Sequence, residues 1–329
     1  MNNIWQKLKK GLGSNPIMVL APMANVTDSP FRRIIMRCGR PDLFFNEFIS
    51  CDGLCSSGRD KLFKDLRFTV EERPIIAQFF GAKPGNFYKC AQLAQELEFD
   101  GIDINMGCPD KSVEKQGAGA ALIKDPKLAQ EVIRETKRGA GPLPVSVKTR
   151  LGYNKIEISE WIPRLLEMDL AALSIHGRTR KEMSFGPAHW ELIGEVAQMA
   201  HPSGTLVIGN GDVSDLADAH SKARSYGLDG IMVGRGIFKN PWFFSAGGGS
   251  AFGGNSSIKT PLEKIEIMAE HISLFTEFWG EGKPFDVMKK FFKVYVTGWE
   301  GANELRVRLM SAKNQGDIKD ILKSYNSMV

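Results

Sequence analysis

The chain has 329 residues, of which 43% are hydrophobic and 25% charged, and its formal net charge is +5 at pH 7. This composition is typical of a globular protein, and no apolar run approaches the roughly 18 residues that suggest a membrane span, so we expect no membrane partner. Residues 1–16 carry lysines but no apolar core for a signal peptide, so a cytoplasmic protein is expected. The five cysteines show no regular framework, which fits a reducing compartment. Nothing in the sequence indicates an obligate protein partner.

Short β-rich runs alternate with helical patterns over residues 1–245. One helical pattern opens with Asp125 as an N-cap and Pro126 at the first helical position. Eight strand–helix units favour an α/β fold of the (β/α)8 TIM-barrel type. A doubly wound sheet is the alternative, but the segment after the first strand, APMANVTDSPF, has no glycine-rich phosphate loop. The predicted strands are residues 18–21, 43–48, 75–79, 101–105, 145–149, 172–176, 206–210 and 230–234.

The last third of the chain has a different character. Residues 246–258 are rich in glycine and serine, which predicts a linker or loop. Residues 259–329 turn to helical patterns and predict a small all-α domain after the barrel.

Polar or glycine-containing groups follow each of the eight predicted strands. Active sites of such barrels lie at the carboxyl ends of the strands, where a single polar residue often only caps a helix or ties a loop. Eight such ends together indicate a polar ring around a site. Its members are Pro22, Met23, Ala24, Glu47, Gln78, Asn105, Cys108, Lys148, Arg150, His176, Arg178, Asn210, Gly211, Asp212, Gly234 and Arg235.

The last two strand ends, IGNGDVSD and MVGRGIFKNPWF, suggest a phosphate site. Glycine lets backbone N–H groups approach phosphate oxygens, and Arg235 adds a charged fork, although ordinary tight turns explain either segment alone. If the phosphate belongs to a flavin nucleotide, Lys148 could stabilise negative charge on its reduced isoalloxazine ring, and Gln78 could hydrogen-bond the pyrimidine edge of that ring. A structural lysine leaving the barrel is the alternative for Lys148.

Six segments in this order resemble the motifs of the tRNA-dihydrouridine synthase family. They are APMANVTDSPFR, INMGCPDKSVEKQGAGAALIKDP, VSVKTRLGY, SIHGRTRKEMSFGPAHW, IGNGDV and GIMVGRGIFKNPWFF. The resemblance runs from about Val19 to Phe244 and implies an FMN-dependent barrel that reduces the C5=C6 bond of particular uridines in tRNA. It implies NADPH, or NADH, as the electron donor. The flavin contacts that it implies are Pro22, Met23, Ala24, Gln78, Lys148 and His176, with Asn210, Gly211, Asp212, Gly234 and Arg235 at the ribityl phosphate.

The resemblance gives Cys108 the role of a general acid, which protonates C5 of the uracil ring while hydride reaches C6. Asn105, three residues earlier, would hold the base edge, and Gly117 and Gly119 would let the following loop close over the base. Without the other motifs, Cys108 is better read as a packed cysteine at a strand end. The remaining cysteines are expected to be structural, and no metal site is predicted.

The segment MKKFFKVYVTGWEGANELRVRL resembles the family's C-terminal signature, which implies a helical tRNA-binding domain. Its candidate phosphate contacts are Lys289, Lys290, Lys293 and Arg306, followed by Arg308. At the barrel mouth, Arg178, Arg180 and Lys181 would guide the RNA. For each of these side chains a solvated charged face is the alternative.

Two rival functions remain open at this point. A flavin barrel acting on a free pyrimidine would share the fold and the cysteine acid, but it would need no basic helical domain. An RNA-binding protein that has lost catalysis would not need Cys108, Lys148 or the phosphate site.

Overall fold

A computed structural model describes residues 3–245 and 259–326, so the predicted linker at 246–258 lies outside the described residues. The chain divides into two compact units. The first, called the barrel unit, comprises Met1–Thr27 and Pro41–Gly234; the second, called the helical unit, comprises Asp28–Arg40 and Arg235–Val329.

The barrel unit is a closed parallel sheet, as the sequence predicts. Its strands are β1 (Ile17–Leu20), β2 (Phe44–Phe45), β3 (Ile49–Ser50), β4 (Ile75–Phe80), β5 (Gly101–Asn105), β6 (Val145–Arg150), β7 (Ala172–His176), β8 (Leu206–Asn210) and β9 (Gly230–Val233). Neighbours follow the order β1-β9-β8-β7-β6-β5-β4-β2. The sheet closes where the Leu20 N–H donates to the Leu43 carbonyl at 3.2 Å and the Leu43 N–H to the Met18 carbonyl at 3.3 Å. The prediction of eight barrel strands is confirmed.

The second barrel strand is split into β2 and β3, which both pair with β4. Asn46 lies between the two segments, and its side-chain Oδ1 accepts the backbone N–H of Gln78 at 2.6 Å. A side-chain amide therefore takes the place of a backbone carbonyl in the ladder, which a hydrophobicity pattern does not reveal.

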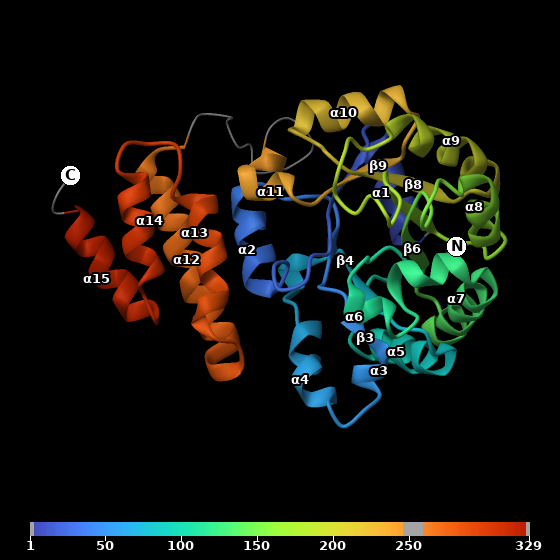
Figure 1. Cartoon of the computed structure of the whole chain (residues 1–329), viewed down its shortest axis with the longest axis horizontal. Helices are drawn as coiled ribbons and strands as arrows, with labels where there is room; N and C mark the ends of the chain where they lie inside the picture. Colours follow the sequence, from blue (N-terminus) through green and yellow to red (C-terminus); the bar gives the residue numbers. More distant parts are fainter. Residues whose placement is uncertain (1–2, 246–258, 327–329) are drawn as a thin grey trace. The chain divides into compact units, whose positions relative to one another are not determined.

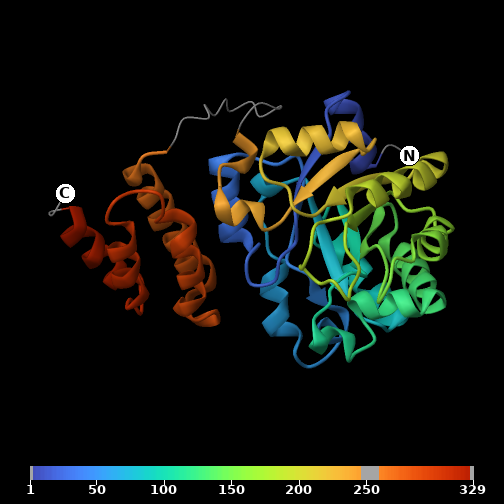
Figure 2. The same ribbon diagram turned by 45° about the horizontal axis from the view of Figure 1, so that its top comes forward.

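Helices surround the sheet, as Figures 1 and 2 show for α5, α7, α8, α9 and α10. The predicted N-cap is confirmed, since Asp125 accepts the N–H of Leu128 at 3.1 Å. The helices of this unit are α1 (Ile4–Leu12), α3 (Cys51–Leu54), α4 (Arg59–Phe63), α5 (Pro84–Glu96), α6 (Lys111–Glu114), α7 (Pro126–Ala140), α8 (Ile158–Leu166), α9 (Trp190–Ala200) and α10 (Leu216–Ser225), with 3-10 turns η1 (Lys64–Leu66), η2 (Val70–Glu72), η3 (Gly119–Lys124) and η4 (His201–Ser203).

Helix α1 covers the amino-terminal end of the barrel. Trp5 is fully buried in a cluster with Ile17, Ala172 and Leu206, the first residues of three strands. Because this end is closed by apolar packing, polar chemistry is left to the carboxyl ends of the strands.

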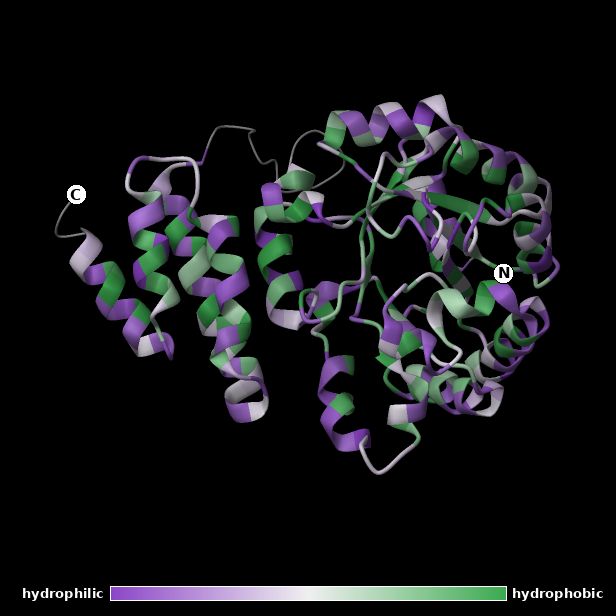
Figure 3. Ribbon diagram, viewed as in Figure 1, coloured by the Kyte–Doolittle hydropathy of each residue, from purple (hydrophilic) through white to green (hydrophobic). Residues whose placement is uncertain are grey.

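The helical unit contains α2 (Ser29–Cys38), α11 (Gly236–Lys239), η5 (Phe243–Ser245), α12 (Pro261–Trp279), η6 (Gly280–Gly282), η7 (Phe285–Met288), α13 (Lys289–Tyr295), α14 (Ala302–Met310) and α15 (Gln315–Asn326). Helix α12 begins with a capping box between Thr260 and Glu263 and ends before Gly280, whose φ is 52°. Figure 3 shows hydrophilic and hydrophobic residues on each of α12 to α14. Amphipathic helices of this kind pack by their apolar faces.

Helix α2 follows β1 in sequence but belongs to the helical unit. The ring of Phe31 lies 5.2 Å from that of Phe291, and Trp279 donates to the Asp28 carboxylate at 2.7 Å. The helical region predicted after the barrel is confirmed. Its predicted start after residue 245 stays a prediction, and the compact units group residues 28–40 and 235–245 with it.

No helix within residues 3–245 and 259–326 combines the length and apolarity that crossing a membrane requires.

Candidate active site

Four side chains of β4, β5 and β6 form a buried polar chain: Gln78, Asp103, Asn105 and Ser146. The Asp103 carboxylate accepts from Gln78 Nε2 at 2.7 Å and from Ser146 Oγ at 2.6 Å. Asn105 Nδ2 donates to Gln78 Oε1 at 3.2 Å. The Gln78 amide is therefore held at both ends, and it keeps one N–H and one lone pair for a further partner.

Burial raises the pKa of Asp103 to about 6, against the hydrogen bonds from Ser146 and Gln78 and the nearby charge of Lys148. A carboxyl with this pKa changes its protonation state just below neutral pH. At neutral pH the ionised carboxylate still accepts hydrogen bonds from Gln78 and Ser146.

Asn105 also holds the loop that carries Cys108. Its Oδ1 accepts the N–H of Gly107 at 3.1 Å and that of Cys108 at 2.9 Å. The Cys108 carbonyl then accepts the N–H of Ala120 at 2.9 Å. At Gly119, whose φ is 61°, an added Cβ would lie 2.7 Å from the Cys108 carbonyl oxygen, so only glycine fits there. The Cys108 backbone is thus fixed from both sides.

The Cys108 side chain is half-buried at the carboxyl end of β5. Burial raises the pKa of the thiol, although a backbone hydrogen bond from Asp110 and the charges of Arg150 and Lys148 act in the opposite direction. The thiol therefore stays protonated at neutral pH, which is the state that a general acid needs.

Lys148 lies next to Asn105 and Ser174 in the strand register. Burial lowers the pKa of its ammonium to about 8, with Arg150 adding repulsion and Asp103 opposing the shift. Within the described residues its ammonium has no hydrogen bond or ion pair, and the buried Ser174 hydroxyl has no hydrogen-bond partner there either. These two groups have the bonding capacity to receive a polar ligand.

Arg150 joins the cysteine loop to the loop after β7. Its Nε donates to the Gly107 carbonyl at 2.7 Å, and its Nη1 donates to the carbonyls of Thr179 at 3.0 Å and Met183 at 2.8 Å. Burial lowers its pKa to about 10, which leaves the guanidinium charged at neutral pH.

The ends of β7 and β8 place His176 beside Asn210. Asn210 Nδ2 donates to the Met232 carbonyl of β9 at 2.7 Å. Gly211 has a φ of 134°, and a Cβ there would lie 2.8 Å from the Cβ of Ala188, so a side chain has no space. The adjoining Asp212 carboxylate accepts the N–H of Ala188 at 3.0 Å.

The loop after β1 reaches the end of β9. A Cβ on Gly234 would lie 3.8 Å from the Met23 sulfur. Pro22 is buried, Met23 half-buried and Ala24 exposed. Arg235 is the first residue of the helical unit and precedes α11.

Two of the arginines predicted to guide RNA have other partners. Arg178 is 1% exposed and forms an ion pair with Asp212. Its Nη1 lies 3.3 Å from His176 Nε2, which must accept because a guanidinium only donates. Arg180 pairs with Glu114 of α6, and that pairing raises its pKa. Both side chains therefore hold loops, whereas Lys181 is exposed.

The candidate RNA contacts of the helical unit are mixed in the same way. Lys290 and Lys293 are exposed on α13, while Lys289 pairs with Asp286 at 2.7 Å. Arg306 donates to the Val296 carbonyl at 2.6 Å and braces the turn between α13 and α14. Phe291, Phe292 and Tyr295 are buried. The aromatic residues thus pack α13 against its own unit.

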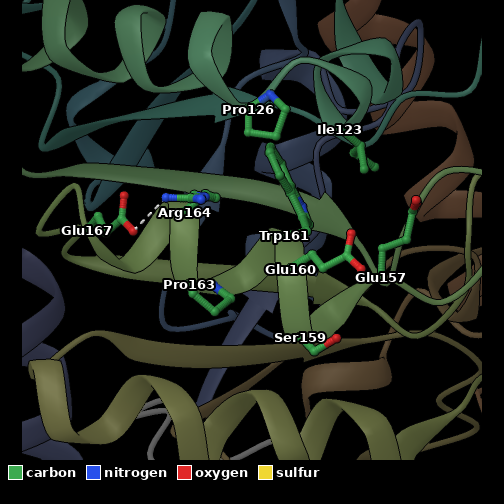
Figure 4. Close-up of a pocket in the computed structure, with 9 residues that line it drawn as sticks. All are labelled: Ile123, Pro126, Glu157, Ser159, Glu160, Trp161, Pro163, Arg164 and Glu167. Carbon is green, nitrogen blue, oxygen red and sulfur yellow. Dashed lines mark hydrogen bonds and ion pairs between the residues drawn. The ribbon is translucent and has the colours of Figure 1, made fainter.

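A surface cavity of about 610 Å³ is lined by residues of η3, the start of α7 and α8 (Figure 4). Its lining includes Trp161 and three glutamates, and none of the predicted site residues. The cavity has no part in the site described above.

Asp103, Arg150 and Glu114 support the site; of these, only Arg150 belongs to the predicted polar ring. Asp103 orients Gln78, Arg150 holds Gly107, and Glu114 holds Arg180. Asp103 gave a signal, since it is an acidic residue inside an apolar strand. The partners of Arg150 and Glu114 lie far away in the chain and gave none.

The family model described as dihydrouridine synthase (Dus) matches residues 19–327. The chain is 42% identical over 328 residues to the "Probable tRNA-dihydrouridine synthase 2" of Bacillus subtilis (strain 168), covering 98% of this chain and 96% of that protein. It is 40% identical over 332 residues to the "Probable tRNA-dihydrouridine synthase" of Staphylococcus aureus (strain COL), covering 99% and 97%. The chain belongs to the dihydrouridine synthase family.

Solved structures confirm the fold alone. Histamine dehydrogenase from Rhizobium sp. 4-9 matches 78% of this chain and 49% of its own, with a TM-score of 0.53 at 12% identity. The 6-hydroxypseudooxynicotine amine oxidase of Pseudomonas geniculata N1 matches 71% and 48%, with a TM-score of 0.52 at 13% identity. The chain thus spans about half the length of each of these chains.

Proposed function

We propose that the protein is an FMN-dependent tRNA-dihydrouridine synthase of the cytoplasm, which reduces the C5=C6 bond of particular uridines in tRNA with electrons from NADPH or NADH. The observation that carries the proposal is a half-buried cysteine, whose backbone is fixed by Asn105, near Lys148 at the carboxyl end of a parallel barrel. The full-length match to the dihydrouridine synthase family supports the reaction.

The residues present fit a flavin mononucleotide. Within the described parts of the chain, the Ser174 hydroxyl has no hydrogen-bond partner, and the Lys148 ammonium, near the charge of Asp103, makes no hydrogen bond or ion pair. The Gln78 amide keeps one free donor and one free acceptor position, which suits the edge of a flavin pyrimidine. Gly211 leaves space where a Cβ would collide, and such glycines let backbone approach a phosphate. The proposed holders are Pro22, Met23, Ala24, Gln78, Lys148, His176, Asn210, Gly211, Asp212, Gly234 and Arg235.

When bound and reduced by NADPH or NADH, FMN would supply the hydride for C6 of the uracil ring. The Cys108 thiol then donates its proton to C5, and the charges of Arg150 and Lys148 stabilise the thiolate that remains. Asn105 fixes the thiol by holding the N–H groups of Gly107 and Cys108. Its Oδ1 is occupied by these two bonds, so we assign Asn105 to positioning the acid. One N–H of its side-chain amide is left to hydrogen-bond the uracil base.

For the RNA, we propose that exposed side chains of both units make the contacts. Lys181 is exposed in the loop after β7, and so is Phe185, whose ring is 75% exposed and can stack on an unpaired base. Lys290 and Lys293 of α13 serve phosphates, together with Lys289 once it leaves Asp286. The target uridine must leave its stack to reach the cysteine.

The experiment incubates the purified protein with unmodified tRNA and NADPH and quantifies dihydrouridine by mass spectrometry of nucleosides. We expect dihydrouridine in tRNA, no comparable turnover of free uracil, and FMN in the supernatant after heat denaturation. Turnover of free uracil at the rate of tRNA would favour the small-molecule reductase. Tight tRNA binding without dihydrouridine and without flavin would favour the non-catalytic RNA-binding protein.

A further inference from the structure

Three cysteines of the barrel unit meet where α3, which directly follows β3, packs on α5. Cys51 begins α3, Cys55 follows its last residue, and Cys90 lies in α5. The Cys90 Sγ lies 3.9 Å from the Cys51 carbonyl oxygen, and the same oxygen accepts the Cys55 N–H at 3.0 Å. One carbonyl therefore brings the Cys90 sulfur and the Cys55 backbone together.

The two side chains also converge. The Cys55 Sγ lies 3.9 Å from the Asn86 carbonyl oxygen, and Asn86 is one helical turn before Cys90 on α5. A helical side chain leans over the turn on its amino-terminal side. The Cys90 sulfur thus leans toward the place that the Cys55 sulfur occupies.

Solvent reaches this pair through a small pocket of about 110 Å³, lined by Leu54, Cys55, Arg59, Lys89, Cys90 and Leu93. Cys55 is exposed, whereas Cys51 is fully buried behind the pair. A small reagent in the pocket meets Cys55 and Cys90 first, and it does so between the two cationic side chains of Arg59 and Lys89.

Neighbouring thiols lower the pKa of Cys90. Hydrogen bonds from the thiols of Cys51 and Cys55, and the charge of Arg59, lower its pKa, while burial and Asp52 oppose them. Burial, with Cys90 as the next cause, raises the pKa of Cys55 to about 11. Within residues 3–245 and 259–326, no group of three or more His, Cys, Asp or Glu side chains is arranged to hold a metal ion. The cluster is therefore better suited to thiol chemistry than to metal binding.

We propose that Cys55 and Cys90 are a peroxide-sensitive thiol pair that closes to a disulfide between α3 and α5. The Cys90 thiol gives up its proton and its sulfur attacks a peroxide oxygen, so that an S–O bond forms and the O–O bond breaks; the departing hydroxide takes up a proton and leaves as one water. The Cys55 thiol loses its proton and attacks the Cys90 sulfenic acid, so that the S–S bond forms and the S–O oxygen leaves as a second water. The two thiols lose two electrons in total, and hydrogen peroxide is reduced to two waters.

The test treats the full-length protein with a small molar excess of hydrogen peroxide and then blocks free thiols with N-ethylmaleimide. Digestion without reductant and mass spectrometry identify the products. We expect a cross-linked Cys55–Cys90 peptide that dithiothreitol cleaves, formed more than about tenfold faster than any oxidation of the buried Cys38. In Cys55→Ser, the cross-link is absent and Cys90 sulfenic acid is trapped by dimedone. The control variant Cys38→Ser gives the wild-type yield of cross-link.

Recovery of Cys55 and Cys90 as alkylated thiols while another cysteine is oxidised would overturn the proposal. A cross-link of either residue to Cys51 in place of the expected pair would also overturn it. The experiment needs neither flavin nor tRNA, so its outcome is independent of the proposed enzymatic function.

Discussion

Both units bury a titratable side chain completely, but they satisfy it differently. In the barrel unit, Asp103 accepts hydrogen bonds from Gln78 and Ser146 and lies near the charge of Lys148. In the helical unit, His271 has one hydrogen bond, between its Nδ1 and the Tyr295 hydroxyl at 3.0 Å, and its Nε2 has no partner within the described residues. The rest of its surroundings is aromatic, with the Phe291 ring 4.8 Å away.

Asp103 of the barrel unit thus lies among hydrogen-bonded polar groups, whereas His271 of the helical unit lies among packed aromatic rings. A bonded chain of polar groups fixes side-chain positions, whereas aromatic packing mainly supplies stability. Burial lowers the pKa of His271 to about 3, so it is neutral across the physiological range. Asp103, with a pKa of about 6, is ionised at neutral pH and held by its donors.

Among the buried polar side chains, the largest expected effect concerns the end of the buried polar chain that holds the cysteine loop. Asn105→Ala removes the acceptor for the N–H groups of Gly107 and Cys108, so the thiol loses its fixed position. We expect uridine reduction by the pre-reduced enzyme to fall by about 10–10²-fold. Single-turnover kinetics on tRNA measure this.

The matched control is Gln116→Ala, which removes an exposed amide from the same loop. Its rate should stay within a factor of about two of wild type. An equal loss of rate in the two variants would show that any substitution in this loop slows uridine reduction. Positioning of Cys108 by Asn105 would then not be supported.

A second contrast compares the two buried groups directly. Asp103→Ala leaves the Gln78 amide and the Ser146 hydroxyl without their acceptor, and we expect it to destabilise the barrel unit by about 2–5 kcal/mol. His271→Phe removes one hydrogen bond and keeps a ring in an aromatic site, so the expected loss is below about 1.5 kcal/mol. Denaturant unfolding with peptide-level hydrogen exchange assigns each loss to its unit. A larger loss in His271→Phe than in Asp103→Ala would reverse the comparison.

Acid should act on the two groups in opposite directions. Between pH 3.8 and about 6 the folded barrel binds a proton on Asp103 that the unfolded chain does not, so this group's contribution to barrel stability grows as pH falls through that window. Between about 3 and pH 6.5 the unfolded chain protonates His271 and the folded unit does not, so the helical unit loses stability as pH falls.

Hydrogen exchange from pH 7 to pH 4.5 measures the local stability of each unit. The contribution of Asp103 is the stability difference between wild type and Asp103→Asn in the barrel strands. The contribution of His271 is the stability difference between wild type and His271→Phe in α12 and α13. The first difference should rise and the second should fall with acid. If both stability differences changed in the same direction on acidification, the assigned pKa shifts would be contradicted.

The smallest expected effect lies on the surface of the helical unit. Changing Lys289, Lys290 and Lys293 together to Ala should weaken tRNA binding and flatten its salt dependence by about 0.7–0.9 log units per lost phosphate contact. The control changes three exposed lysines of the C-terminal region, Lys313, Lys319 and Lys323, to Ala. Equal salt slopes for both triple variants would show that Lys289, Lys290 and Lys293 are solvated and do not contact RNA phosphates.

The strands were predictable because their signal is local. Each of the eight runs is a short apolar segment, and the structure places a strand in every one of them. Cys108 and Lys148 could be proposed as site residues because they lie in recognisable motifs, Lys148 within a predicted strand and Cys108 just after one.

The partners of side chains were not predictable in the same way. Arg178 looks like an RNA contact in sequence, but its ion-pair partner Asp212 is 34 residues away. The assignment of α2 to the helical unit depends on Phe31 meeting Phe291, which lies in the last third of the chain. Such contacts are set by packing, and no periodicity in the chain encodes them.

The most direct test of the account is the rate of uridine reduction by Cys108→Ala, measured after anaerobic pre-reduction and mixing with unmodified tRNA. The matched control is Cys55→Ala, which removes an exposed cysteine that follows α3 and is not among the proposed site residues. We predict that Cys108→Ala is slower by about 10²–10⁴-fold, the usual contribution of a positioned acid, while NADPH oxidation in the reductive half-reaction and the rate of the control are unchanged. A Cys108→Ala variant that reduces tRNA at the wild-type rate would contradict the account.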